Sequence, residues 1–295
     1  MKVTGPVLCT LLLAACSLSA TSKSSGPIVV PGPASPQPEP SALAPQQPNV
    51  NHIHALAARA GSTRLLVATH RGIELASPGA SPAPLGGSAP KGDVLQVLYA
   101  ADGTAYASGH NLGVLVSHDD AATWSVTAPE VAGLDVHGLA LDPTNRSTLY
   151  AYAVGRGMLV SSDGGGHWQH RAGYADSHYL TGLAVTADGT LLAGSPELGI
   201  AASTDHGSTF VSVRAGTGQV YSIGASPVSP DDVIVATEDG IFLTADGGKN
   251  WDVGQTEVVI TGVGADLANA KRFFAGGADG SIYTSTDGGV SWNPL

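Results

Sequence analysis

The chain has 295 residues, of which 43% are hydrophobic and 13% charged, and its formal net charge is −11. Because 13 lysines and arginines face 24 aspartates and glutamates, no basic excess is available to neutralise phosphates, which argues against nucleic acid and acidic headgroups as partners. The length suits one large domain or two small ones, and 39 glycines with 19 prolines favour a turn-rich, all-β chain.

Residues 1–15 have the basic, apolar and small-residue zones of a signal peptide. The apolar run from Val7 to Ala15 is too short to span a bilayer. It ends in Leu-Ala-Ala-Cys16, which resembles the bacterial lipobox, where cleavage before the cysteine leaves it lipidated. We therefore expect a lipoprotein anchored through Cys16 to a bacterial cell membrane and facing the cell envelope. The alternative is an ordinary secretory signal with an incidental cysteine.

Residues 16–48 hold eight prolines among Ser, Gly and Gln, a composition typical of an extended tether rather than a packed element. We expect the folded domain to occupy residues 49–295.

One eight-residue pattern recurs five times in that domain, each time as Ser or Thr, any residue, Asp, and an aromatic residue five positions after the Asp. The aspartates are Asp119, Asp163, Asp205, Asp246 and Asp287. Their spacings of 44, 42, 41 and 41 residues have the length of a propeller blade.

The five copies resemble the Asp-box, or BNR, repeat of sialidase-like and sortilin-like β-propellers. In such a turn the Asp accepts backbone hydrogen bonds, Gly adopts positive φ, and Trp packs its ring between neighbouring sheets. We therefore interpret these residues as hairpin architecture rather than catalytic machinery.

Strand patterns precede each copy, for example Val136 to Leu141 and Thr148 to Val154. A sixth set, His52 to Ala57, Arg64 to Thr69 and Gly72 to Ser77, lacks the box. Six units of four strands predict a six-bladed β-propeller built from four-stranded antiparallel blades. Since only three residues follow Trp292, the outer strand of the last blade is either very short or supplied from the N-terminal side.

In a propeller the first strand of each blade lines the central channel. Superposing the repeats on their boxes places one set of residues at one level of the channel: His54, Gln96, His137, Thr181, Tyr221 and Thr261. Two residues earlier, on the same strand face, come His52, Val94, Asp135, Tyr179, Gln219 and Val259.

Polar residues at this channel face are candidates for binding a ligand: His54, Arg71, His110, His137, Arg156, Tyr179, Tyr221 and Asp239. The His-x-His pair and its neighbours could also bind a transition metal such as zinc or copper, through His52, His54, His70 and His137. The alternative interpretation is a wet polar channel wall without a metal.

Enzymatic activity is a separate possibility. A sialidase needs three arginines around a carboxylate, and only Arg71 and Arg156 map to the channel-facing loops. A general glycoside hydrolase needs two carboxylates, for which Glu197 and Glu238 are the best pair. We favour a propeller that binds a protein or glycan at its channel face, with glycoside hydrolase and extracytoplasmic metal-binding protein as alternatives.

Overall fold

The computed structural model describes residues 52–254 and 256–295. The predicted signal peptide, lipidated Cys16 and tether lie outside the described residues. Within the described part, no helix has the length and apolar character needed to cross a bilayer.

The described chain is all-β apart from two short 3₁₀ turns, Pro129–Val131 and Tyr174–Asp176. Twenty-four strands follow one another in sets of four. The first twelve are β1 (Ile53–Ala58), β2 (Leu65–Thr69), β3 (Gly72–Ser77), β4 (Ala80–Pro84), β5 (Val94–Tyr99), β6 (Ala105–Gly109), β7 (Gly113–Ser117), β8 (Ser125–Val126), β9 (Val136–Leu141), β10 (Leu149–Ala153), β11 (Gly157–Ser161) and β12 (Gln169–Arg171). The remaining twelve are β13 (Thr181–Val185), β14 (Leu191–Ser195), β15 (Gly199–Ser203), β16 (Val211–Arg214), β17 (Val220–Ala225), β18 (Asp232–Thr237), β19 (Gly240–Ala245), β20 (Asp252–Gly254), β21 (Ile260–Ala265), β22 (Phe273–Gly277), β23 (Ile282–Ser285) and β24 (Asn293–Pro294).

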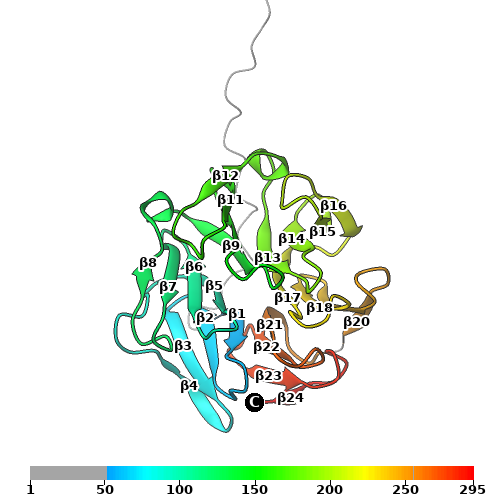
Figure 1. Cartoon of the computed structure of the whole chain (residues 1–295). Helices are drawn as coiled ribbons and strands as arrows, with labels where there is room; N and C mark the ends of the chain where they lie inside the picture. The colour runs from blue at the N-terminus through cyan, green and yellow to red at the C-terminus, as the bar shows by residue number, and fades with distance from the viewer. Residues whose placement is uncertain (1–51, 255) are drawn as a thin grey trace, which may run out of the picture. The chain divides into compact units, whose positions relative to one another are not determined.

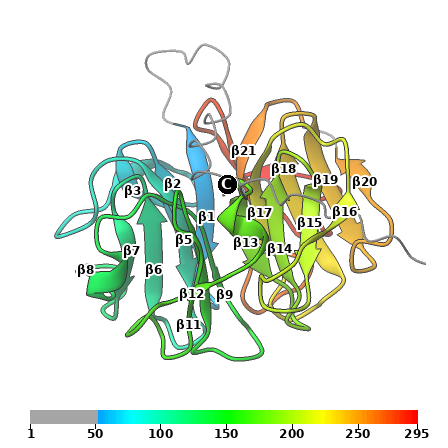
Figure 2. The ribbon, with the colours of Figure 1, turned by 90° about the horizontal axis from the view of Figure 1, so that it is seen from above.

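Each set of four pairs antiparallel in chain order, so every set is a meander. The first strands of the sets neighbour one another in a closed cycle, β1, β5, β9, β13, β17, β21 and again β1. Figure 1 shows these six inner strands around the centre and the fourth strands, such as β4, β8 and β20, at the outside. Seen at right angles in Figure 2, the sheets stand side by side around that centre.

The expectation of six separate blades is wrong as stated. Four sheets are separate, whereas the first and last sets form one eight-stranded sheet in which β1 and β21 pair in parallel at Ala55 and Val263. Glycines explain this pairing, because a Cβ on Gly264 would lie 1.9 Å from the carbonyl oxygen of Leu56. The close approach is reinforced by the Thr261 hydroxyl, which donates to the carbonyl of Ile53 at 2.7 Å.

The outer strand of the last set is the two-residue β24, which pairs with β23. Of the two arrangements considered from the sequence, the very short C-terminal strand is therefore the one present. The first set, which lacks the box, keeps all four strands and turns from β3 to β4 through Pro78 and Gly79.

The hydrophobic core consists of clusters that lie between successive sets rather than one central mass. At the junction of the last and first sets, Phe274 is completely buried among Ile53, Leu65 and Val67. Face-to-face packing of neighbouring sheets thus supplies the stability of the ring.

The five repeated turns share one hydrogen-bond pattern. In each, the Asp accepts from the Ser or Thr hydroxyl two residues before it, and from the backbone N–H and the side chain of the residue four positions after it. These side-chain and backbone bonds lower the pKa of Asp119, Asp205, Asp246 and Asp287 to about 2. All five aspartates therefore have a structural task, as expected for residues that hold a tight turn.

Candidate functional site at the channel mouth

Every inner strand carries a β-bulge close to its first residue. The extra residues are His54, Leu95, His137, Gly182, Tyr221 and Thr261. A bulge re-aims the side chain of its extra residue and is frequent next to functional sites. We call the level of these bulges the channel mouth.

The first cluster at the mouth joins residues from two neighbouring sets. His54 is the bulged residue of β1, His70 follows β2, and Asp93 immediately precedes β5. Asp93 Oδ1 lies 2.9 Å from His70 Nδ1 and 3.2 Å from His54 Nε2, and the two ring nitrogens are 3.3 Å apart. The side chains are 18–28% exposed, so the cluster is partly screened from solvent.

The charges in this cluster are set by burial and by hydrogen bonds. Burial lowers the pKa of His54 and outweighs its interactions with Asp93, whereas the hydrogen bond to Asp93 raises the pKa of His70. Burial acts to raise the pKa of Asp93, but the hydrogen bonds with both histidines outweigh it and hold that pKa well below the usual range. Asp93 is therefore a carboxylate at neutral pH.

A second cluster of two histidines and one aspartate lies one set further along the chain. His110 follows β6, Asp135 precedes β9, and His137 is the bulged residue of β9. Asp135 Oδ1 lies 2.8 Å from His110 Nδ1 and 3.1 Å from His137 Nε2. The Tyr179 hydroxyl hydrogen-bonds the other ring nitrogen of His137.

The two clusters are in contact. His110 Nε2 lies 3.6 Å from Asp93 Oδ2, so the imidazole of His110 stands between the two carboxylates. In the described part of the chain, these are the two groups of side chains able to hold a metal ion. The donor set of each, two imidazoles and one carboxylate, suits zinc or copper.

The structure divides the four predicted metal ligands. His54 and His70 meet in the first cluster, while His137 belongs to the second. His52 lies beside the first cluster, with its ring centroid 5.5 Å from that of His70, and is in neither group.

The other predicted binding residues, Arg71, Arg156, Tyr221 and Asp239, belong to neither cluster. Arg71, Arg156 and Asp239 are exposed. Tyr221 is a bulged residue of the mouth, and its pKa is raised by burial and by the charges of Glu238 and Asp239.

The two glutamates predicted as a catalytic pair have different surroundings. Glu197 is 59% exposed, and its Oε2 lies 3.4 Å from His178 Nε2. Glu238 accepts a hydrogen bond from the backbone N–H of Gln219 at 3.3 Å. Their joint role stays a prediction.

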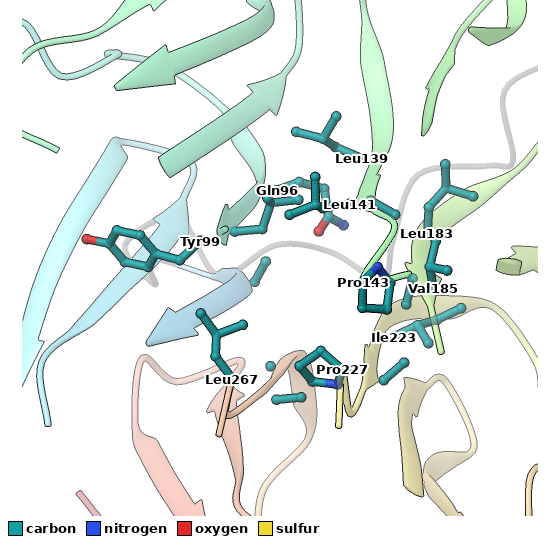
Figure 3. A pocket seen from close by; sticks show the side chains of 18 of the residues that line it. Gln96, Tyr99, Leu139, Leu141, Pro143, Leu183, Val185, Ile223, Pro227 and Leu267 are labelled. Atoms are coloured by element: carbon teal, nitrogen blue, oxygen red, sulfur yellow. The ribbon is translucent and has the colours of Figure 1, made fainter. Parts of the chain in front are cut away.

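The opposite end of the channel is lined mainly by apolar side chains. A cavity there is lined by the later residues of the inner strands and by the loops that follow them. Figure 3 shows Leu139, Leu183, Ile223, Pro227 and Leu267 gathered around it. Gln96 and Arg146 are polar residues in the same lining, so the channel has a polar mouth and a mainly apolar far end.

Sequence reasoning missed Asp93 because superposing the repeats on their repeated turns placed Val94, not Asp93, at the channel level of Asp135. The bulges show that Leu95, not Gln96, is the equivalent of His54, and that Gly182, not Thr181, fills this level in the fourth set. The signal that could have found it is the repeated Asp-Val pair, Asp93-Val94 and Asp135-Val136, directly before an inner strand.

No protein-family model matches the chain. Its sequence is 27% identical over 197 residues to a xyloglucanase of Hypocrea jecorina (strain QM6a), a match that covers 62% of this chain and 22% of that protein. Among solved structures, it is similar to a GH74 enzyme of Niastella koreensis, with a TM-score of 0.56, 15% identity, and coverage of 80% of this chain and 45% of the other. It is also similar to YCF48 bound to a D1 peptide, with a TM-score of 0.53, 17% identity, and coverage of 80% and 78%.

The meander sheets, the closed cycle of inner strands and these structural neighbours define a β-propeller. The chain spans less than half the length of the GH74 enzyme and about a fifth of the xyloglucanase. Propellers host many functions, so the site rather than the fold has to carry the assignment.

Proposed function

We propose that the chain is an extracytoplasmic, lipid-anchored propeller that binds a glycan at its channel mouth. The carrying observation is that hydroxyl, imidazole and carboxylate groups gather there beside aromatic rings, whereas most side chains at the far end of the channel are apolar. Binding sites of this kind use a few placed polar groups to orient a ligand against aromatic surfaces. The xyloglucanase relative supports a glycan as the ligand class.

Two finer features belong to the same proposal. We count the eight-stranded sheet as two blades, which gives a six-bladed ring, because six inner strands follow one another in a closed cycle. We also take the five repeated turns as Asp boxes, because all five aspartates accept the same set of bonds. The lipid anchor at Cys16 rests on the lipobox-like sequence alone.

Hydrolysis of the bound glycan is the second candidate function. It is favoured by the names of the relatives, a xyloglucanase and a GH74 enzyme. Glu197 and Glu238 would supply the two carboxylates that such a reaction needs, one as acid and the other as base or nucleophile.

Isothermal titration of the full chain with xyloglucan oligosaccharides tests the binding proposal. We expect saturable binding that falls at least tenfold in Tyr221→Ala, which removes an aromatic side chain from the mouth. A matched control is Val253→Ala, at an exposed position of the outer strand β20. The absence of binding to any oligosaccharide of a plant and bacterial glycan panel, with the fold intact, would overturn the proposal.

Release of reducing ends from the same oligosaccharides tests hydrolysis. We expect turnover that falls at least a hundredfold in Glu197→Gln and in Glu238→Gln while binding persists. Binding without turnover in the unaltered chain would reject hydrolysis and leave the binding function in place.

A further inference from the structure

We propose that the mouth holds two divalent transition-metal sites, one formed by His54, His70 and Asp93 and the other by His110, Asp135 and His137. Each site takes Zn²⁺ or Cu²⁺ with two imidazoles and one carboxylate. The sites do not depend on glycan binding.

The geometry of the first cluster matches a metal site. A tetrahedral zinc bound at about 2.0 Å places neighbouring ligand atoms about 3.3 Å apart. The atoms His54 Nε2, His70 Nδ1 and Asp93 Oδ1 form a triangle with sides of 3.3, 3.2 and 2.9 Å. A small rearrangement would seat the ion above this triangle, with a fourth position left for water or substrate.

The second cluster supplies the same donor types, two of them from equivalent places in the repeat. In both clusters, a loop histidine after a second strand meets the Asp that precedes the next inner strand, as His70 meets Asp93 and His110 meets Asp135. The third ligand is a bulged histidine in both cases, but His54 comes from the set that carries the loop histidine, whereas His137 comes from the set that carries the Asp. The two clusters thus share the pairing of a loop histidine with an Asp and the same donor types, but each recruits its bulged histidine from a different side of that pair.

Groups around the ligands would orient them. A metal-bound histidine normally uses its other ring nitrogen to hydrogen-bond a neighbour that fixes the ring. Tyr179 does this for His137. His110 would bind the second ion through Nδ1 while its Nε2 faces Asp93 of the first site, so the two sites share a structural link.

Both sites are accessible to metal ions from solvent. The ligand side chains are between 12% and 38% exposed, which allows entry from solvent while part of each coordination sphere is shielded. The two carboxylates offset two of the four charges that a pair of divalent ions brings, and the partial exposure of the ligands leaves the other two charges accessible to water.

Titration of the chelator-stripped full chain with ZnCl₂ and with CuCl₂, followed by calorimetry and elemental analysis, tests the proposal. We expect two equivalents of either metal, and for Cu²⁺ an electron paramagnetic resonance spectrum with nitrogen hyperfine structure. MgCl₂ and CaCl₂ should not bind at the same concentration, since these ions prefer oxygen ligands.

Substitutions assign the sites. His54→Gln should remove one equivalent, His137→Gln the other, and the double variant both. The matched control is His170→Gln, which breaks an exposed pair with Asp176 (2.6 Å) that has no third ligand among the described residues. Tyr179→Phe should weaken only the second site, by about 10–100-fold. Circular dichroism confirms that each variant is folded.

Three results would overturn the proposal: less than a tenth of an equivalent of zinc and copper bound at tenfold excess, equal binding of Mg²⁺ and Zn²⁺, or the same loss in His170→Gln. One equivalent that only His54→Gln removes would retain the first site and overturn the second. Glycan titration of the metal-free chain distinguishes failure of the metal proposal from failure of the proposed glycan binding. Removing the metal leaves Tyr221 in place, so glycan binding should persist without it.

Discussion

Replacing Phe274 with alanine tests whether the junction between the last and the first sets of strands is packed as tightly as the junctions between the other sets. Phe274 is fully buried between the last and the first sets of strands, and the guanidinium of Arg272 lies 5.0 Å from its ring centroid. Removing a buried phenylalanine side chain costs about 3–5 kcal/mol through lost burial and the cavity that remains. For a domain of this size, that corresponds to a fall in Tm of roughly 6–20 °C.

The neighbouring residue provides an internal control. Phe273 is 1% exposed and packs on the other face of the same strand, against the β17–β20 sheet. Urea unfolding followed by circular dichroism should give similar losses for Phe273→Ala and Phe274→Ala, with unchanged m-values. A loss below about 1 kcal/mol for Phe274→Ala alone would refute a tightly packed closing junction, since even a partly collapsed cavity costs more than this.

Three further predictions test the repeated turns and one ion pair, that of the half-exposed Lys271 with the buried Asp232. Ala121→Gly should raise the free energy of unfolding by about 0.5–1 kcal/mol, as measured by chemical denaturation. The reason is that Ala121 has a φ of +66°, and the other four turns have glycine at the equivalent position. Lowering the pH from about 4 to 2 should reduce Tm. The pKa of Asp287 in the folded chain is about 2, which is below its value in the unfolded chain. The ionised Asp287 therefore stabilises the folded chain above the unfolded pKa, and this stabilisation is lost as the carboxylate protonates. Asp287→Asn should melt lower at pH 7 and show a smaller fall between pH 4 and 2, and an unchanged acid profile would contradict this account. Lys271→Met should cost about 1–3 kcal/mol because it leaves the 6% exposed carboxylate of Asp232 without its partner, whereas Lys249→Met at an exposed position should be neutral in the same melt.

The fold was largely accessible from the sequence because its information is local and repeated. The Asp of each repeated turn fixes that turn through bonds that reach up to four residues along the chain, and alternating strands such as Val136 to Leu141 follow directly from the pattern. The joining of β1 to β21 was not predictable, because it depends on Gly262 and Gly264 meeting a backbone about two hundred residues away.

The site was accessible only in part. The histidines were visible as a set, but their grouping depends on bulges that shift each inner strand by one residue relative to strict alternation. The loops between box and inner strand also differ in length, so superposition on the boxes placed Val94 where Asp93 belongs. A carboxylate one position away from the expected face was therefore overlooked, although it contacts two of the predicted ligands.

The bond between Thr261 and the carbonyl of Ile53 joins residues 208 positions apart. During synthesis, β1 therefore leaves the ribosome long before its partner β21 exists, and meander sheets can form one after another while the circle stays open. The first set lacks one of its two neighbours until the last set arrives. Shortened chains that stop before β21 should thus form open arcs whose apolar face on β1 and β2 is exposed, which makes them prone to proteolysis and self-association. Closure of the ring is the step that protects the molecule from both.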